Sequence, residues 1–189
     1  MIEGHLVIDF HGHVGRWDDL GFVDDQSAML QAMDAVGIDR SCVFNIFQPE
    51  GSIGNNETAV FVARHPNRFI GFAYVSPLLP DLMVPELERA VDELGFRAIK
   101  LYPPYTPYPL NHPAWDPIYA FANERALAVL AHTGSGKASE PRHLREAARR
   151  FSKASFVAGH AGNFEPYRSQ AIKVAQDCPN VYLETCSTF

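Results

Sequence analysis

Short apolar segments alternate with amphipathic segments along the whole of this 189-residue chain. The apolar segments are rich in β-forming residues and end in turn residues, which is typical of buried strands. The segments between them repeat apolar residues at helical spacing. This alternation predicts a parallel sheet with helices outside it, either an open doubly wound sheet or a βα barrel. The expected strands are residues 6–13, 41–47, 69–75, 96–102, 128–132, 155–160 and 181–185.

Turn residues indicate where the first two helices begin and end. Asp24 or Asp25 is expected to cap the first helix, and Gly37 to end it in the left-handed conformation. Residues 48–56 contain proline and glycine, so they are expected to form a loop. The second helix is then expected to begin at about Glu57.

Composition narrows the class of protein. With 47% hydrophobic and 20% charged residues, the chain is expected to form one globular domain. A net charge of -6 leaves no basic surface for nucleic acid, and the apolar runs are too short to span a membrane. The N-terminus lacks an export signal, and the three cysteines have no paired spacing, which fits a reducing cytoplasm. We therefore expect a cytoplasmic protein that acts on a small molecule, with assembly into a homo-oligomer as a further expectation.

Histidines stand at the ends of three expected strands. His11 and His13 end the first strand and point to the same side, because side chains alternate along a strand. His132 and His160 end the fifth and sixth strands, and Lys100 lies near the end of the fourth. Barrel enzymes place their active sites at this end of the strands, so these residues favour the barrel. The alternative interpretation is that the histidines are core or loop residues that hydrogen-bond to carbonyls.

Five segments carry the strand-end motifs: Asp9–His13, Gly95–Pro103, Ala131–Gly134, Gly159–Gly162 and Asn180–Thr185. Together they resemble the amidohydrolase superfamily. The resemblance runs over nearly the whole chain and is closest to the amidohydrolase-2 group, which includes decarboxylases that act on aminocarboxymuconate semialdehyde and many metal-dependent hydrolases. It implies a TIM-type barrel and a metal-dependent enzyme.

The resemblance implies a role for each strand-end histidine. His11 and His13 would be metal ligands from the first strand, and His132 would be a ligand from the fifth. His160 would either bind a second metal or act in catalysis by polarising the substrate and bound water. The implied cofactor is a divalent cation, and zinc is the expected metal because imidazoles bind it well.

Lys100 has two interpretations. In some members of the superfamily the corresponding strand carries a carbamylated lysine that bridges two metals. The competing interpretation is a cationic catalytic lysine that pairs with a substrate carboxylate or with Glu184. We favour the second, because the decarboxylase-like branch resembles a design with one metal.

Three further residues are candidates for substrate binding. Arg16 and Trp17 follow the first histidine pair and could bind a carboxylate and a ring, although a solvated loop is the alternative. Tyr102 lies at the start of a proline-rich loop expected above the barrel mouth, where it would contact the substrate or pack in a surface loop. Asp9 is expected either to orient the histidines or to close the bottom of the strand.

The sequence departs from the family at its C-terminal end. The family's last essential group is an aspartate at the end of the eighth strand, and no such segment follows the seventh expected strand. We therefore expect residues 1–189 to form a single, incomplete barrel domain of about seven βα units, with the eighth missing through C-terminal truncation.

The leading hypothesis for function is a metal-dependent hydrolase that acts on a small carboxylated or lactone-like substrate through a metal-activated water. One alternative is a non-oxidative decarboxylase of the same family. Another is a catalytically incomplete, metal-binding fragment that needs a partner.

Overall fold

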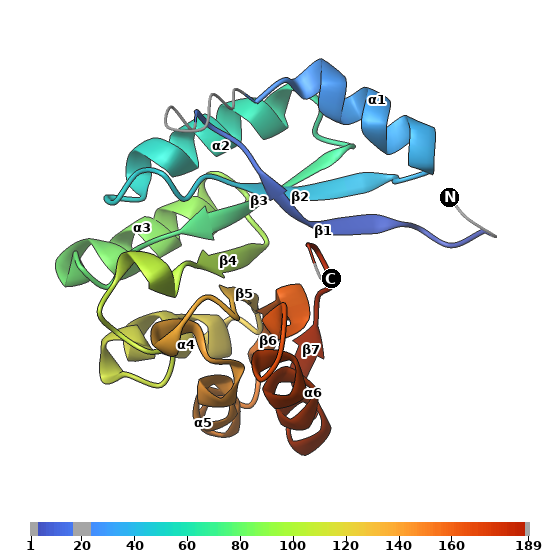
Figure 1. Cartoon of the computed structure of the whole chain (residues 1–189). Helices are drawn as coiled ribbons and strands as arrows, with labels where there is room; N and C mark the ends of the chain where they lie inside the picture. Colours follow the sequence, from blue (N-terminus) through green and yellow to red (C-terminus); the bar gives the residue numbers. More distant parts are fainter. Residues whose placement is uncertain (1–3, 17–23, 188–189) are drawn as a thin grey trace.

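A curled sheet of parallel strands organises the molecule (Figure 1). The computed structural model describes residues 4–16 and 24–187. The strands follow one another around the sheet in sequence order, and each is hydrogen-bonded in parallel to the next. This arrangement confirms the predicted TIM-type barrel, with seven strands among the described residues. They are β1 (Ile8–His13), β2 (Arg40–Phe44), β3 (Phe69–Tyr74), β4 (Ala98–Leu101), β5 (Ala128–His132), β6 (Ser155–Gly159) and β7 (Val181–Leu183).

Helices connect the strands and cover the outer face of the sheet (Figure 1). Their apolar sides pack on the outward side chains of the strands and form the larger core, which includes Leu87, Tyr119 and Phe156. The helices are α1 (Gln26–Val36), α2 (Ser52–Arg64), α3 (Pro80–Asp92), α4 (Asp116–Glu124), α5 (Leu144–Arg150) and α6 (Tyr167–Asp177).

A second, smaller core fills the inside of the curl. Strand side chains alternate between the two faces, so the inward residues of neighbouring strands meet there. This inner cluster includes Phe44, Phe72, Tyr74 and Leu130, all buried. Phe44 and Phe72 stack with their ring centroids 6.1 Å apart. The inner core forms the floor beneath the C-terminal ends of the strands.

The predicted ends of the first helix are confirmed, but the predicted start of the second is wrong. The Asp25 carboxylate accepts a hydrogen bond from the Ala28 backbone N–H at 3.1 Å, and Gly37 ends α1 with a φ of 76°. However, α2 begins at Ser52, within the stretch predicted as a loop. Tertiary contacts of Asn55 override the weak helix propensity of this segment.

The Asn55 side chain connects α2 to the sheet through hydrogen bonds. Its side-chain amide donates to the Tyr74 carbonyl at 3.1 Å and to Glu86 Oε1 at 2.8 Å, and its oxygen accepts from the Tyr74 N–H at 2.9 Å. Asn55 is completely buried. One amide therefore joins β3, α2 and α3.

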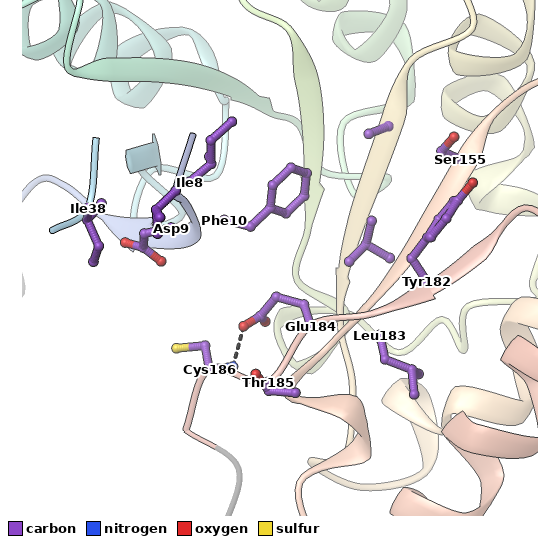
Figure 2. A pocket seen from close by; sticks show the side chains of 13 residues that line it. Ile8, Asp9, Phe10, Ile38, Ser155, Tyr182, Leu183, Glu184, Thr185 and Cys186 are labelled. Carbon is purple, nitrogen blue, oxygen red and sulfur yellow. Dashed lines mark hydrogen bonds between the residues drawn. The ribbon is translucent and has the colours of Figure 1, made fainter. Parts of the chain in front are cut away.

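The two edge strands, β1 and β7, face each other across a cleft of about 720 Å³. Figure 2 shows Asp9 and Phe10 on one side of this cleft, and Tyr182 and Glu184 on the other. Ile8 and Tyr182 are exposed, at 42% and 54%. The sheet is thus curled but open between its first and last strands.

We predict that Asn55→Ala lowers the free energy of unfolding by about 2–3 kcal/mol, because it leaves the Tyr74 N–H and the Glu86 carboxylate without this buried partner. Asn56→Ala is the control, since Asn56 is exposed on the same helix. Urea denaturation of the two variants measures the effect. Equal stability of the two variants would contradict this role for Asn55.

Candidate active site

Four imidazoles meet at the C-terminal ends of the strands. The ring centroids of His13 and His11 lie 5.3 Å apart, those of His11 and His160 4.7 Å, and those of His160 and His132 4.6 Å. These ring contacts run without a gap from His13 to His132, although the four histidines come from β1, from β5 and from the turn directly after β6. The fold therefore gathers all four strand-end histidines of the sequence into one cluster.

His11 is held from both sides. Its Nδ1 lies 2.7 Å from Glu184 Oε2, and its Nε2 lies 3.0 Å from Lys100 Nζ. A carboxylate accepts hydrogen bonds, so Nδ1 carries the proton and Nε2 keeps its lone pair. An imidazole that donates to a carboxylate through one nitrogen and keeps the other as an acceptor has the arrangement that metal-binding histidines commonly show.

A second hydrogen-bonded chain orients His160 and His132. His160 Nδ1 donates to the Cys186 carbonyl at 2.8 Å, which leaves Nε2 as an acceptor, 3.0 Å from His132 Nδ1. His132 then donates through Nδ1, and its Nε2 accepts from the Ser135 hydroxyl at 2.5 Å. Both imidazoles are therefore neutral, and each accepts a hydrogen bond through its Nε2.

Burial keeps the histidines unprotonated. It lowers the pKa of His11 to about 4, and the hydrogen bond to Glu184 only partly opposes this. Burial and the nearby Lys100 lower the pKa of His132 to about 2. The same causes lower the pKa of His13 to about 2, although His13 is exposed and water screens part of the effect. Neutral imidazole is the form that binds metals.

Lys100 lies under the cluster with none of its surface exposed. Burial lowers the pKa of Lys100 to about 7, against the attraction of Glu184. Its Nζ lies 4.5 Å from the centroid of the Phe44 ring. Its hydrogen-bond partner is His11, whereas the sequence favoured a pairing with Glu184 or a substrate. Near neutral pH the amine can both give up and accept a proton.

Comparison with known proteins identifies the family. The family model described as amidohydrolase matches residues 8–189. The chain belongs to the amidohydrolase family. It is thus a metal-dependent enzyme of the amidohydrolase superfamily, as its sequence motifs implied.

Solved structures support the fold of this amidohydrolase. An uncharacterised TIM-barrel protein from Bordetella bronchiseptica is 22% identical with a TM-score of 0.74, and the match covers 96% of this chain and 75% of that one. A 5-carboxyvanillate decarboxylase from Sphingomonas paucimobilis is 16% identical with a TM-score of 0.71, covering 97% and 78%. A dihydroxybenzoic acid decarboxylase from Polaromonas, with bound manganese, is 19% identical with a TM-score of 0.66, covering 83% and 66%.

The predicted substrate-binding residues separate in the structure. Tyr102 lies beside the cluster, with its ring centroid 4.7 Å from that of His132. Arg16 instead lines a depression with Asp24 and Glu57, and the histidines are not among the residues around it. Trp17 lies outside the described residues. Only Tyr102 is therefore placed beside the amidohydrolase histidines.

Asp9 does not orient the imidazoles directly. Its carboxylate accepts from the Ser41 hydroxyl at 2.7 Å and from the His11 backbone N–H at 3.2 Å. It therefore ties β1 to β2 and fixes the backbone at His11. Glu184 is the carboxylate that contacts the His11 ring.

Sequence reasoning missed one residue of the site, Cys186. Among the described residues, a group of potential ligand atoms that all lie within 4.8 Å of one another belongs to His11, His160 and Cys186. In a curled sheet the segment after β7 lies beside β1, and this was the signal that could have indicated Cys186.

Across residues 4–16 and 24–187, no helix has the length and apolar character needed to cross a membrane.

We predict that the metal-free amidohydrolase loses stability as the pH falls from 6.5 toward 4. The unfolded His11 binds a proton below its ordinary pKa of 6.5, whereas the folded His11 stays neutral down to about 4. Acid therefore favours the unfolded state, by on the order of 3 kcal/mol for this buried residue. Urea denaturation in the presence of a chelator measures the effect.

Two variants separate His11 from the other titrating groups. His11→Gln is expected to make the pH dependence between 6.5 and 5 less steep, because it removes one of the titrations that the lowered histidine pKa values create. His65→Gln is the control, since His65 is exposed. A wild-type stability that is the same at pH 6.5 and pH 5 would contradict this origin of the acid sensitivity.

Proposed function

We propose that this amidohydrolase hydrolyses a small carboxylated or lactone-like substrate with the help of a divalent cation. The observation that carries the proposal is the cluster of neutral imidazoles at the strand ends, with the amine of Lys100 directly beneath it. Neutral nitrogen ligands and a nitrogen base with a pKa near 7 are what metal-assisted hydrolysis requires.

We assign His11, His13 and His132 as the ligands of this cation. All three imidazoles are neutral, and His11 and His132 keep Nε2 as an acceptor. A cation would therefore replace Lys100 at His11 and the Ser135 hydroxyl at His132. His13 and His132 would also have to move toward His11, because the group of ligand atoms within 4.8 Å found among the described residues contains His11 without them. When bound, the cation would polarise a carbonyl and acidify a water molecule. Zinc remains the expected metal, and manganese is the second candidate because the decarboxylase from Polaromonas binds it.

The remaining groups of the cluster would move protons and bind the substrate. His160 has its Nδ1 proton committed to the Cys186 carbonyl, and its Nε2 would take a proton from the attacking water by exchanging its hydrogen bond from His132 for one from that water. Lys100 can protonate the leaving oxygen or pair with a substrate carboxylate, since burial lowers its pKa to about 7. Tyr102 would form the wall of the site beside His132.

The second candidate reaction is non-oxidative decarboxylation. It is supported by the two decarboxylases among the structural neighbours, which share the barrel and are under 25% identical to this chain. The same groups would serve it: Lys100 would bind the carboxylate or protonate the carbon that loses carbon dioxide. The two candidates therefore differ in their products and share their residues.

We expect a screen of lactones and aromatic carboxylates, with zinc or manganese added, to identify a substrate. Hydrolysis incorporates oxygen from labelled water into the product, whereas decarboxylation releases carbon dioxide without it. His132→Ala is expected to lower kcat/KM by at least about a hundredfold, because it removes a proposed ligand. The matched control is His65→Ala on the exposed end of α2.

Two results would count against the proposed function. One is turnover that survives complete removal of divalent cations. The other is a His132→Ala variant as active as His65→Ala.

Lys100→Met separates catalysis from stability. Because Lys100 is fully buried, an apolar side chain of similar length is expected to leave the free energy of unfolding unchanged or to raise it. We expect kcat to fall by about 10²–10⁴-fold, since the variant lacks the proton-transferring amine. Lys153→Met, at an exposed position, is the control. Full activity of Lys100→Met would refute a catalytic role for the amine.

The open cleft between β1 and β7 supports one other candidate, a metal-binding protein completed by a partner. An added strand in this cleft would pair with the free edges of both strands. In that case the chain would bind metal in isolation without turnover, an outcome that the same screen registers. A cytoplasmic location and self-association into a homo-oligomer stay predictions.

A further inference from the structure

A thiol lies beside two buried histidines of the site. Potential ligand atoms of His11, His160 and Cys186 lie within 4.8 Å of one another. The two histidines are 6% and 9% exposed, and Cys186 is partly exposed. Two imidazole nitrogens and one sulfur make a donor set that suits zinc and cobalt and is poorly suited to manganese or magnesium.

Backbone contacts fix the position of Cys186. Its N–H donates to Glu184 Oε1, and its carbonyl accepts from His160 Nδ1 at 2.8 Å. The other oxygen of the same carboxylate bonds to His11 Nδ1. The contacts that orient both imidazoles therefore also fix the backbone that carries the thiol.

The separation of the three groups is close to what a shared cation needs. Ligands around a tetrahedral zinc ion lie roughly 3.3–3.8 Å apart, given Zn–N and Zn–S bonds of about 2.0 and 2.3 Å. The distance left to close is therefore roughly 1–1.5 Å at most. Rotation of the Cys186 side chain between staggered positions can supply it, because this residue is only partly buried.

A cation could reach the three groups through the cleft. Cys186 lines it together with Asp9 and Glu184, as Figure 2 shows. Cys186 thus borders both the cleft and the histidine cluster.

We propose that His11, His160 and Cys186 bind a thiophilic divalent cation, Zn²⁺ or Co²⁺, with the Cys186 thiolate as a ligand. On binding, the S–H proton passes to solvent and the sulfur–metal bond takes its place. The inference rests on the proposed function and replaces its ligand set for zinc: His11 is shared, and a bound Zn²⁺ would take His160 and Cys186 in place of His13 and His132, so the two sites exclude each other at His11. A sulfur ligand adds little to the affinity of a site for Mn²⁺, so Mn²⁺ is expected to bind His11, His13 and His132.

Titration of the chelator-treated, reduced protein with Co²⁺ tests this inference. A near-ultraviolet thiolate-to-cobalt charge-transfer band should grow to a plateau at one equivalent. Cys186→Ser should abolish the band and weaken Zn²⁺ binding by at least about tenfold, while Mn²⁺ binding stays the same within about twofold. Cys178→Ser, which alters a buried cysteine at the end of α6, should keep the band.

The outcomes separate this inference from the proposed function. Cobalt binding to the wild type without the band, or a band that persists in Cys186→Ser, would overturn the thiolate ligand and leave the proposed function standing. His160→Ala should remove the band and His13→Ala should keep it. A normal band in a protein without metal-dependent turnover would support the site and count against the proposed function.

Discussion

The hydrogen bond between Glu184 and His11 joins the two ends of the curled sheet. These residues are 173 positions apart in sequence and belong to β1 and to the segment directly after β7, the two edge strands of the sheet. Glu184 also accepts hydrogen bonds from the backbone N–H groups of His160 and Cys186, and these three contacts outweigh burial and lower the pKa of its carboxyl group. The carboxylate therefore stays ionised, and it sets the orientation of His11 on which the rest of the histidine cluster depends.

The same arrangement places polar groups where burial is costly. Lys100 is fully buried against Phe44, and His11 and His160 are nearly so. Burial of ionisable groups lowers stability unless they become neutral and hydrogen-bonded; here both histidines are neutral, burial lowers the pKa of Lys100 to about 7, and all three are hydrogen-bonded. A protein gains little stability from such a cluster, so its presence points to function, in keeping with the metal-dependent chemistry of the family.

Local sequence patterns predicted much of this fold. The alternation of strands and helices gave the barrel, and His11, His132 and His160 could be assigned to one end of it because parallel strands end on one face. The start of α2 was missed because Asn55 is held by residues of β3 and α3, which a local pattern does not contain. The Lys100–His11 contact and the place of Cys186 also depend on how the sheet curls, which brings β4 and the end of β7 to the same imidazole.

The central claim is that His11, held by Glu184, binds a cation at the strand ends. Anomalous diffraction from crystals soaked in manganese, and separately in zinc, tests it most directly. The account predicts a peak within about 2.0–2.3 Å of His11 Nε2 for each metal. Metal peaks that lie away from His11, with His11 Nε2 still hydrogen-bonded to Lys100, would contradict the account.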